Sequence, residues 1–290
     1  MLSCGRMITA RTTESLEAFL DAMDRIALVE VARAKGSTPR EAGACMLVSR
    51  SAIHGTIGGG QLEFMAIDQA RQMLADMRAP YEFMLDVPLG PEIGQCCGGR
   101  VEVLIRLMNE GLRAELLEAA KSEEARMPHV YIFGGGHVGL ALANALSLLP
   151  VKATVVETRA EAAEGMPEGV ETRLTSVPEE MVRSAPAGSA FVVLTHDHAL
   201  DFLIVAEALK RQDAAYVGMI GSQTKKATFR NWYLKSAGGS DADFLRLVSP
   251  IGGEAVKDKR PAVIAALAAA EIMTALATHS AAADARAAAG

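Results

Sequence analysis

The cysteine-containing segment at residues 94–99, Gly-Gln-Cys-Cys-Gly-Gly, has the most distinctive chemistry in this sequence. Neighbouring Cα atoms lie about 3.8 Å apart, whereas a relaxed disulfide needs roughly 4.4–6.8 Å, so Cys96 and Cys97 are predicted to be thiols. In an extended segment their side chains point in opposite directions, which allows one thiol to face a ligand. The alternative is that both act as small buried hydrophobic residues in a glycine turn.

A glycine-rich turn follows the apolar strand expected at residues 130–133, with Gly134, Gly136 and Gly139 in the spacing Gly-x-Gly-x-x-Gly. The first glycine allows a tight turn, the second lets a phosphate approach the backbone, and the third lets helix and strand pack closely. Glu157 ends the next expected strand, where a carboxylate can hold a ribose. The pattern predicts a phosphate at a helix N-terminus, and a domain of this fold that has changed or lost its ligand is the open alternative.

A second glycine-rich turn, Gly58-Gly59-Gly60, precedes a helix predicted from residue 61 onward. Successive glycines can direct several N–H groups into one concavity, so the turn is a candidate anion site, although a plain tight turn is the simpler interpretation. The loop at residues 36–40 adds two hydroxyls, a rigid proline and Arg40, whose planar guanidinium suits phosphate or carboxylate. For Arg40 the alternative is a solvated surface charge.

Residues 195–198, Thr-His-Asp-His, follow another expected strand, at the edge where open α/β sheets place ligand contacts. A zinc site needs three or four ligands, and no nearby cysteine or histidine pattern completes such a set, so zinc is not expected. His196 is a candidate for a polar contact to a cofactor, and Asp197 for capping the next helix. The lysines at 225 and 226 are interpreted as solvated charges.

Strands and helices alternate from residue 127 onward, which predicts a Rossmann-like, doubly wound parallel sheet across residues 127–278. Residues 11–126 mix helices with strands and close with a charged helical connector before Met127 and Pro128. We therefore expect an α/β protein in which an N-terminal mixed α+β domain precedes the Rossmann-like domain. The alanine-rich residues 279–290 are expected to form a disordered tail.

The composition restricts the partners and the cellular compartment of the protein. The formal net charge of −6 argues against a broad electrostatic contact with nucleic acid or with an anionic membrane surface. The uncharged run at residues 130–151 is broken by glycines and a proline, so it is not interpreted as a membrane span. Four cysteines, two of them adjacent, do not suggest a disulfide scaffold, and a cytoplasmic location is expected.

The joint presence and order of these segments resembles the XdhC/CoxF family of xanthine dehydrogenase accessory proteins. The segments that carry the resemblance are residues 36–40, residues 55–60 with Glu63, and residues 94–99, 133–139 and 216–222. The resemblance implies a carrier rather than an enzyme. Such a carrier binds the molybdenum cofactor, holds it while a cysteine desulfurase supplies the terminal sulfur, and inserts it into apo xanthine dehydrogenase.

The resemblance also implies which residues contact the cofactor. A molybdenum dithiolene centre favours sulfur, so Cys97, in the family's Cys-Gly-Gly element, is the first choice for a contact to molybdenum and Cys96 is the second. The sequence departs from the family pattern at residue 157, where aspartate is expected, and at residues 254–263. The other candidate cofactor-binding residues are Gln95, Gly58, Gly59, Gly60, Arg40, Gly134, Gly136, Gly139, Glu157 and His196.

The alternative function is an NAD(P)-dependent oxidoreductase, which the fingerprint ending in Glu157 supports. It ranks second because the sequence lacks a clear set of lysine, tyrosine or histidine residues for hydride transfer. The expected partners are therefore apo xanthine dehydrogenase, a cysteine desulfurase and the molybdenum cofactor. The sequence is compatible with a homodimer.

Overall fold

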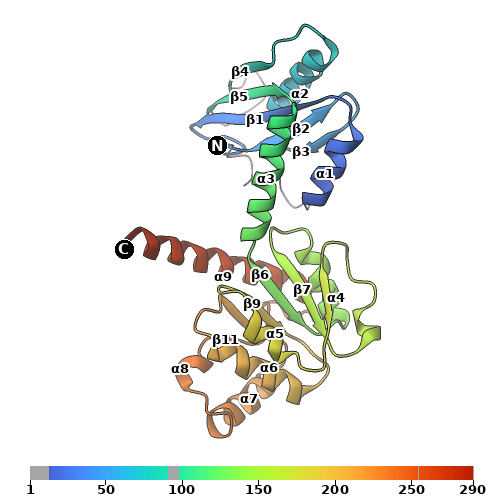
Figure 1. The fold of residues 1–290 in the computed structure, drawn as a ribbon. Helices are drawn as coiled ribbons and strands as arrows, with labels where there is room; N and C mark the ends of the chain where they lie inside the picture. Colours follow the sequence, from blue (N-terminus) through green and yellow to red (C-terminus); the bar gives the residue numbers. More distant parts are fainter. Residues whose placement is uncertain (1–12, 91–97, 254, 290) are drawn as a thin grey trace. The chain divides into compact units, whose positions relative to one another are not determined.

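The chain divides into two compact units, Met1–Arg126 (unit 1) and Met127–Gly290 (unit 2) (Figure 1). The computed structural model describes residues 13–90, 98–253 and 255–289. Each unit has its own sheet and its own hydrophobic clusters. The predicted fold class is confirmed, because a mixed α+β unit precedes a unit with a parallel sheet.

Unit 1 contains a five-stranded antiparallel sheet in the order β3-β2-β1-β5-β4. Alternate residues of the central strand β1 face two different clusters: Val29 and Val31 face one, and Leu28 faces the other. Helix α2 covers the first face, and α1 and α3 cover the second. The elements are α1 (Thr13–Ala22), β1 (Ile26–Lys35), β2 (Cys45–Ser49), β3 (Ile53–Gly55), α2 (Gly60–Ala75), β4 (Glu82–Pro88), β5 (Arg100–Leu107) and α3 (Glu110–Arg126).

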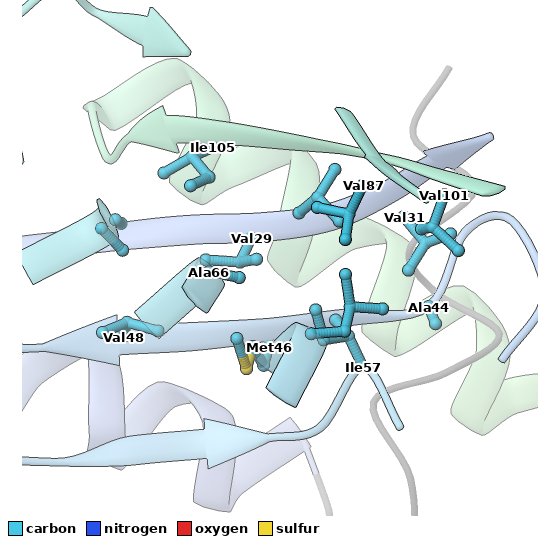
Figure 2. Packing of buried hydrophobic residues seen from close by; sticks show 14 of the residues in the cluster. Val29, Val31, Ala44, Met46, Val48, Ile57, Ala66, Val87, Val101 and Ile105 are labelled. Carbon is cyan, nitrogen blue, oxygen red and sulfur yellow. The ribbon is translucent and has the colours of Figure 1, made fainter. Parts of the chain in front are cut away.

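Helix α2 is held on the sheet by an apolar stripe that includes the fully buried Leu62, Ala66 and Ala70. Ile57, just before the helix, is also fully buried and belongs to the same cluster as Val31, as Figure 2 shows. A side chain locked in a close-packed core fixes the backbone on either side of it. Ile57 and the α2 stripe therefore fix both ends of the Gly58–Gly60 turn.

Unit 2 contains a six-stranded parallel sheet in the order β11-β10-β9-β6-β7-β8. With β6 counted as the first strand, this is the 3-2-1-4-5-6 order of dinucleotide-binding Rossmann sheets. The order reverses between β6 and β9, so the segments that follow these two strands meet at the ligand-binding edge of such sheets. The strands are β6 (His129–Phe133), β7 (Lys152–Glu157), β8 (Glu171–Leu174), β9 (Ala190–Val193), β10 (Tyr216–Met219) and β11 (Leu247–Val248).

Helices cover both faces of this sheet, as expected for a doubly wound fold. Within β6, Val130 and Ile132 face the cluster shared with α4 and α9, whereas Tyr131 and Phe133 face the cluster shared with α5, α6 and α7. The helices are α4 (His137–Leu146), η3 (Ala160–Ala163, a 3-10 turn), α5 (Glu179–Ser184), α6 (His198–Lys210), α7 (Gln223–Lys235), α8 (Asp241–Phe244) and α9 (Pro261–Ala289).

Helix α9 corrects the expectation of a disordered tail, because it continues through residues 279–289. Alanine has the highest helix propensity, so a helix already nucleated on a core extends through an alanine-rich segment. In the described part of the chain, α9 is also the one helix long and apolar enough to span a membrane, over Pro261–Arg286. Its buried residues, including Ala265, Ala268 and Ile272, pack in the core of unit 2.

Candidate functional site

The fingerprint glycines of unit 2 meet separate steric demands. Gly134 follows β6 with φ +114°, and a Cβ atom on it would lie 2.5 Å from the carbonyl oxygen of Leu194, beyond β9. A Cβ on Gly139 would lie 1.9 Å from the carbonyl oxygen of Gly134. Gly136 is the N-cap residue of α4, and apart from its chain neighbours no atom of the described residues lies within 4 Å of a Cβ built there. The N-terminus of α4 is therefore open beside Gly136, where unpaired N–H groups favour an anion.

Glu157, at the end of β7, binds backbone groups of its own chain. Its Oε2 atom accepts the N–H of Gly135 at 2.9 Å, and Oε1 accepts the N–H groups of Thr158 at 2.8 Å and Arg159 at 3.2 Å. Burial raises the pKa of Glu157, but these N–H donors and the Arg159 side chain outweigh burial and hold the pKa below its ordinary value. Only 4% of Glu157 is exposed, so the carboxylate stabilises the turn, which differs from the predicted role of holding a ribose.

His196 lies at the same edge of the sheet as the Gly134 turn. A Cβ on Gly134 would lie 3.0 Å from the Cα atom of Thr195, and the next residue, His196, is exposed. Asp197 caps α6 by accepting the N–H of Ala199 at 2.8 Å, as the sequence predicts. Among the described residues, no group of three or more histidine, cysteine, aspartate or glutamate side chains is arranged to hold a metal ion.

In unit 1, the end of the cysteine-containing segment packs against the loop that follows β1. Gly98 forms an isolated parallel bridge with Ser37, and a Cβ on Gly36 would lie 3.2 Å from the Cα atom of Gly99. A Cβ on Gly99 would lie 2.3 Å from the carbonyl oxygen of Ser37, so only glycine fits there. Gly98 also donates its N–H to the carbonyl oxygen of Leu89 at 2.9 Å. The two loops thus meet through backbone atoms.

The same loop contacts the Gly58–Gly60 turn. A Cβ on Gly58 would lie 2.7 Å from the Cβ atom of Pro39 and 3.2 Å from the Cγ atom of the half-buried Arg40. Unit 1 therefore brings together Arg40, the second glycine-rich turn and Gly98, which are far apart in the sequence. The adjoining candidates Gln95, Cys96 and Cys97 lie outside the described residues, and their roles stay predictions.

The Gly58–Gly60 turn already contains an anionic group, the carboxylate of Glu63. Its Oε2 atom accepts the hydroxyl of Thr56 at 2.5 Å and the N–H groups of Ile57 at 2.9 Å and Gly59 at 3.1 Å. The N–H of Gly58 is directed to the Thr56 hydroxyl oxygen at 3.0 Å. This corrects the expectation that Gly58 and Gly59 present N–H groups to an external anion, because both groups are bound internally.

Two features of the chemistry differ from the sequence-based interpretation, a buried ion pair in unit 2 and a disulfide-bonded cysteine in unit 1. Lys225, interpreted as a solvated charge, is 9% exposed and forms an ion pair with the fully buried Asp201. Asp201 lies among apolar residues on the buried side of α6. Because an aspartate is rarely fully buried without a partner, its place in this apolar segment could have predicted a buried cation nearby. In unit 1, Cys45 is buried on β2 and is disulfide-bonded, whereas the number and spacing of the cysteines did not suggest a disulfide scaffold.

Two family models match the chain and together include most of the segments described above. Residues 130–272 match the XdhC Rossmann domain, and residues 19–85 match the XdhC and CoxI family. The chain belongs to the XdhC and CoxI family. The first match covers the sheet of unit 2 as far as α9, and the second covers the Arg40 loop and the Gly58–Gly60 turn of unit 1. The resemblance inferred from the sequence is confirmed.

One curated relative and one solved structure extend the comparison. The uncharacterized protein YqeB of Escherichia coli (strain K12) is 26% identical over 236 residues, which are 78% of this chain and 39% of YqeB. The chain thus spans about two fifths of the length of this relative. A solved structure described as a xanthine dehydrogenase from Bacillus halodurans is 17% identical, with a TM-score of 0.75 over 92% of this chain and 96% of that chain. At this identity the match establishes a shared fold.

Proposed function

We propose that this protein is a molybdenum cofactor carrier for the maturation of xanthine dehydrogenase. It binds the cofactor, holds it while a cysteine desulfurase supplies the terminal sulfur, and inserts it into apo xanthine dehydrogenase in the cytoplasm. Membership of the XdhC and CoxI family supports this role, as does the fold shared with the Bacillus halodurans structure. The protein itself acts as a carrier and has no catalytic residue of its own in this proposal.

The observation that carries the proposal is the contact in unit 1 among three segments far apart in the sequence, residues 36–40, 58–60 and 98–99. Gly36 packs on Gly99, and Pro39 and Arg40 pack on Gly58, so the loop that ends in Arg40 touches both other segments. Such close backbone packing preorganises a binding surface that includes Arg40, whose guanidinium suits the cofactor phosphate. Cys97 immediately precedes Gly98 in the chain and is proposed to contact molybdenum, with Cys96 as the second candidate.

The two glycine-rich turns differ as candidate binding sites for the cofactor phosphate. In unit 1 the N–H groups of Gly58 and Gly59 are bound internally, so a phosphate would have to bind at the first turn of α2, which begins at Gly60. In unit 2 the N-terminus of α4 is open at Gly136. Gly136 has φ −64°, so an alanine there narrows the approach to the backbone of α4 without straining it. Lost retention in Gly136→Ala assigns the phosphate to unit 2, and unchanged retention assigns it to unit 1, where Gly60 has φ +68° and alanine itself would be strained.

The alternative function, an NAD(P)-dependent oxidoreductase, has the strand order of unit 2 in its favour. The position of Glu157 speaks against it, because both carboxylate oxygens accept backbone N–H groups rather than facing a ribose. In addition, a Cβ on Gly135 would lie 1.9 Å from the carbonyl oxygen of Ala162, so η3 covers the turn beside Glu157. We therefore rank the oxidoreductase second.

The test is anaerobic equilibration of the full chain with molybdenum cofactor, followed by gel filtration and measurement of bound molybdenum and pterin. We expect stoichiometric retention by the wild-type protein. Cys97→Ala and Arg40→Ala should weaken retention about tenfold, a loss of one strong contact. Arg33→Ala, a change in an arginine whose side chain is 71% exposed, is the matched control and should leave retention unchanged. Cys96→Ala tests the second candidate, and a larger loss of retention than in Cys97→Ala would assign the contact to Cys96.

Transfer is tested with the same loaded protein and apo xanthine dehydrogenase, with recovery of enzyme activity as the readout. Absence of cofactor retention by the wild-type chain would overturn the proposal. Saturable NAD binding together with turnover in a substrate screen would instead establish the oxidoreductase.

A further inference from the structure

A buried ion pair lies beneath the ligand-binding edge of unit 2. Asp201, on α6, has no exposed surface, and Lys225, on α7, is 9% exposed. The Nζ atom of Lys225 donates to Oδ2 of Asp201. The pair thus links two helices that follow neighbouring strands, β9 and β10.

The other carboxylate oxygen of Asp201 holds the loop that follows β9. Oδ1 accepts the N–H of Thr195 at 2.9 Å and the Thr195 hydroxyl at 2.7 Å. Thr195 in turn packs on the backbone of Gly134, since a Cβ on Gly134 would lie 3.0 Å from the Thr195 Cα atom. A continuous set of contacts therefore runs from Lys225 through Asp201 and Thr195 to the Gly134 turn.

The start of α7 is shaped around the lysine. A Cβ on Gly221 would lie 2.6 Å from Cδ of Lys225, so the glycine leaves room for the aliphatic part of the side chain. Ser222 caps the helix by accepting the N–H of Lys225 at 3.3 Å. Lys225 is therefore held at both its backbone and its side chain, and it presents its ammonium group to Asp201 from a fixed position.

A buried ion pair adds little to the net free energy of unfolding. Removing two charges from water costs about as much as their attraction returns, and apolar replacements of the whole pair are often neutral or stabilising. Hydrogen bonds to a charged group are directional, however, so the pair selects one conformation of the groups it binds. Here the selected groups are the N–H and hydroxyl of Thr195.

We infer that Asp201 and Lys225 are positioning residues, which hold Thr195 against Gly134 so that the edge formed by the Gly134 turn and His196 keeps one conformation for ligand binding. The inference rests on the proposed function in one respect, the prediction that Gly136 and His196 contact the bound cofactor. The pair itself touches the loop and not the ligand.

The decisive variant replaces the pair as a whole, Asp201→Leu with Lys225→Met, in the full chain. If the pair only stabilises the fold, this replacement should lower the melting temperature and leave exchange of the neighbouring loop amides and cofactor retention close to those of the wild type. If the pair positions the edge, amide hydrogen exchange at residues 134–136 and 196–198, whose N–H groups do not themselves bind Asp201, should rise about tenfold while the melting temperature stays close to the wild-type value, and cofactor retention should fall about tenfold.

Matched variants separate charge from packing. Lys225→Arg keeps the positive charge and should restore retention toward wild type, whereas Lys226→Met, a change in the half-buried neighbour, should leave exchange and retention unchanged. Unchanged loop exchange in the apolar double variant would overturn the positioning role. Raised exchange with unchanged retention would overturn the link to the ligand. If wild-type protein retains no cofactor, the proposed function fails, and hydrogen exchange alone decides the positioning role.

Discussion

The Oε2 atom of Glu157 accepts the backbone N–H of Gly135 at 2.9 Å, so a carboxylate of the protein occupies the turn that the glycine spacing marks for a phosphate. In unit 1 the Oε2 atom of Glu63 accepts the N–H of Gly59 at 3.1 Å in the same manner. Each glycine-rich turn is thus stabilised by an internal anion. An external anion could therefore bind at the first N–H groups of α4 and α2, the helices that follow the two turns.

Replacement of Glu157 by glutamine should lower the free energy of unfolding by about 1–3 kcal/mol at neutral pH, because the charge-assisted hydrogen bonds to the turn are lost. The pKa of Glu157 is lower in the folded chain than the ordinary 4.5 expected after unfolding. Its stabilisation is therefore fully present above the unfolded pKa and is lost as the pH falls through the folded pKa.

The measurement is urea denaturation of the wild type and Glu157→Gln at a series of pH values. The stability difference should be largest near neutrality and should shrink in acid. Glu164→Gln, a change in an exposed residue of the same unit, is the control and should have little effect. A difference between wild type and Glu157→Gln that does not vary with pH would contradict the assigned role.

Alanine should change the stability of unit 2 strongly at Gly139 and only slightly at Gly136, the two glycines near the start of α4. Gly139→Ala places a Cβ 1.9 Å from the carbonyl oxygen of Gly134. Helix α4 and the Gly134 turn must then move apart, so unit 2 should be destabilised by more than about 3 kcal/mol. Gly136 has φ −64° and an open surrounding, so Gly136→Ala should change stability by less than about 1 kcal/mol. Thermal denaturation of both variants checks this, and similar losses in the two would be inconsistent with the geometry.

Removal of the Glu63 side chain should destabilise unit 1. In Glu63→Ala the N–H groups of Ile57 and Gly59 lose their acceptor, at a cost of about 1–3 kcal/mol, whereas Glu63→Gln retains one oxygen acceptor and should cost less. Asp68→Ala, at an exposed position on the same helix, serves as the control. Denaturant titration ranks the three variants, and a loss for Asp68→Ala equal to that of Glu63→Ala would refute the prediction.

The tyrosines of unit 2 should ionise only at more alkaline pH than free tyrosine. Burial, reinforced by the Glu271 carboxylate that accepts the Tyr216 hydroxyl at 2.9 Å, raises the pKa of Tyr216 well above its ordinary 10.0. Burial likewise raises the pKa of Tyr131 and Tyr233. Because these folded pKa values exceed the unfolded ones, the associated stability is present below pH 10 and is lost as the pH rises through the folded values.

Tyrosinate absorbance provides the test. Near pH 10 the native protein should show a much smaller signal than the protein in denaturant. Tyr216→Phe should leave the native signal near this pH unchanged and reduce the denatured signal by one of the chain's four tyrosines. Loss of native signal in the variant would show that Tyr216 ionises in the folded state.

The sequence predicted the parts of the fold whose signals are local. The apolar strands at β6, β7, β9 and β10, the glycine spacing at Gly134–Gly139 and the stripe of α2 all follow from periodicity over a few residues. Short elements with exposed, charged residues escaped prediction. All four residues of β8 are exposed, so no apolar pattern marks this strand, and it exists because β7 supplies its hydrogen-bonding partner.

For the candidate site, the sequence by itself determined the residue types, their spacing and the family to which the chain belongs. Only the tertiary structure decided which N–H groups are already bound by Glu63 and Glu157, and that Lys225 is buried against Asp201. It also decided that the Arg40 loop meets Gly58 and Gly99. The reason is physical: a local pattern fixes the periodicity of the backbone, whereas these contacts join residues far apart in the chain and arise only when the sheets have assembled.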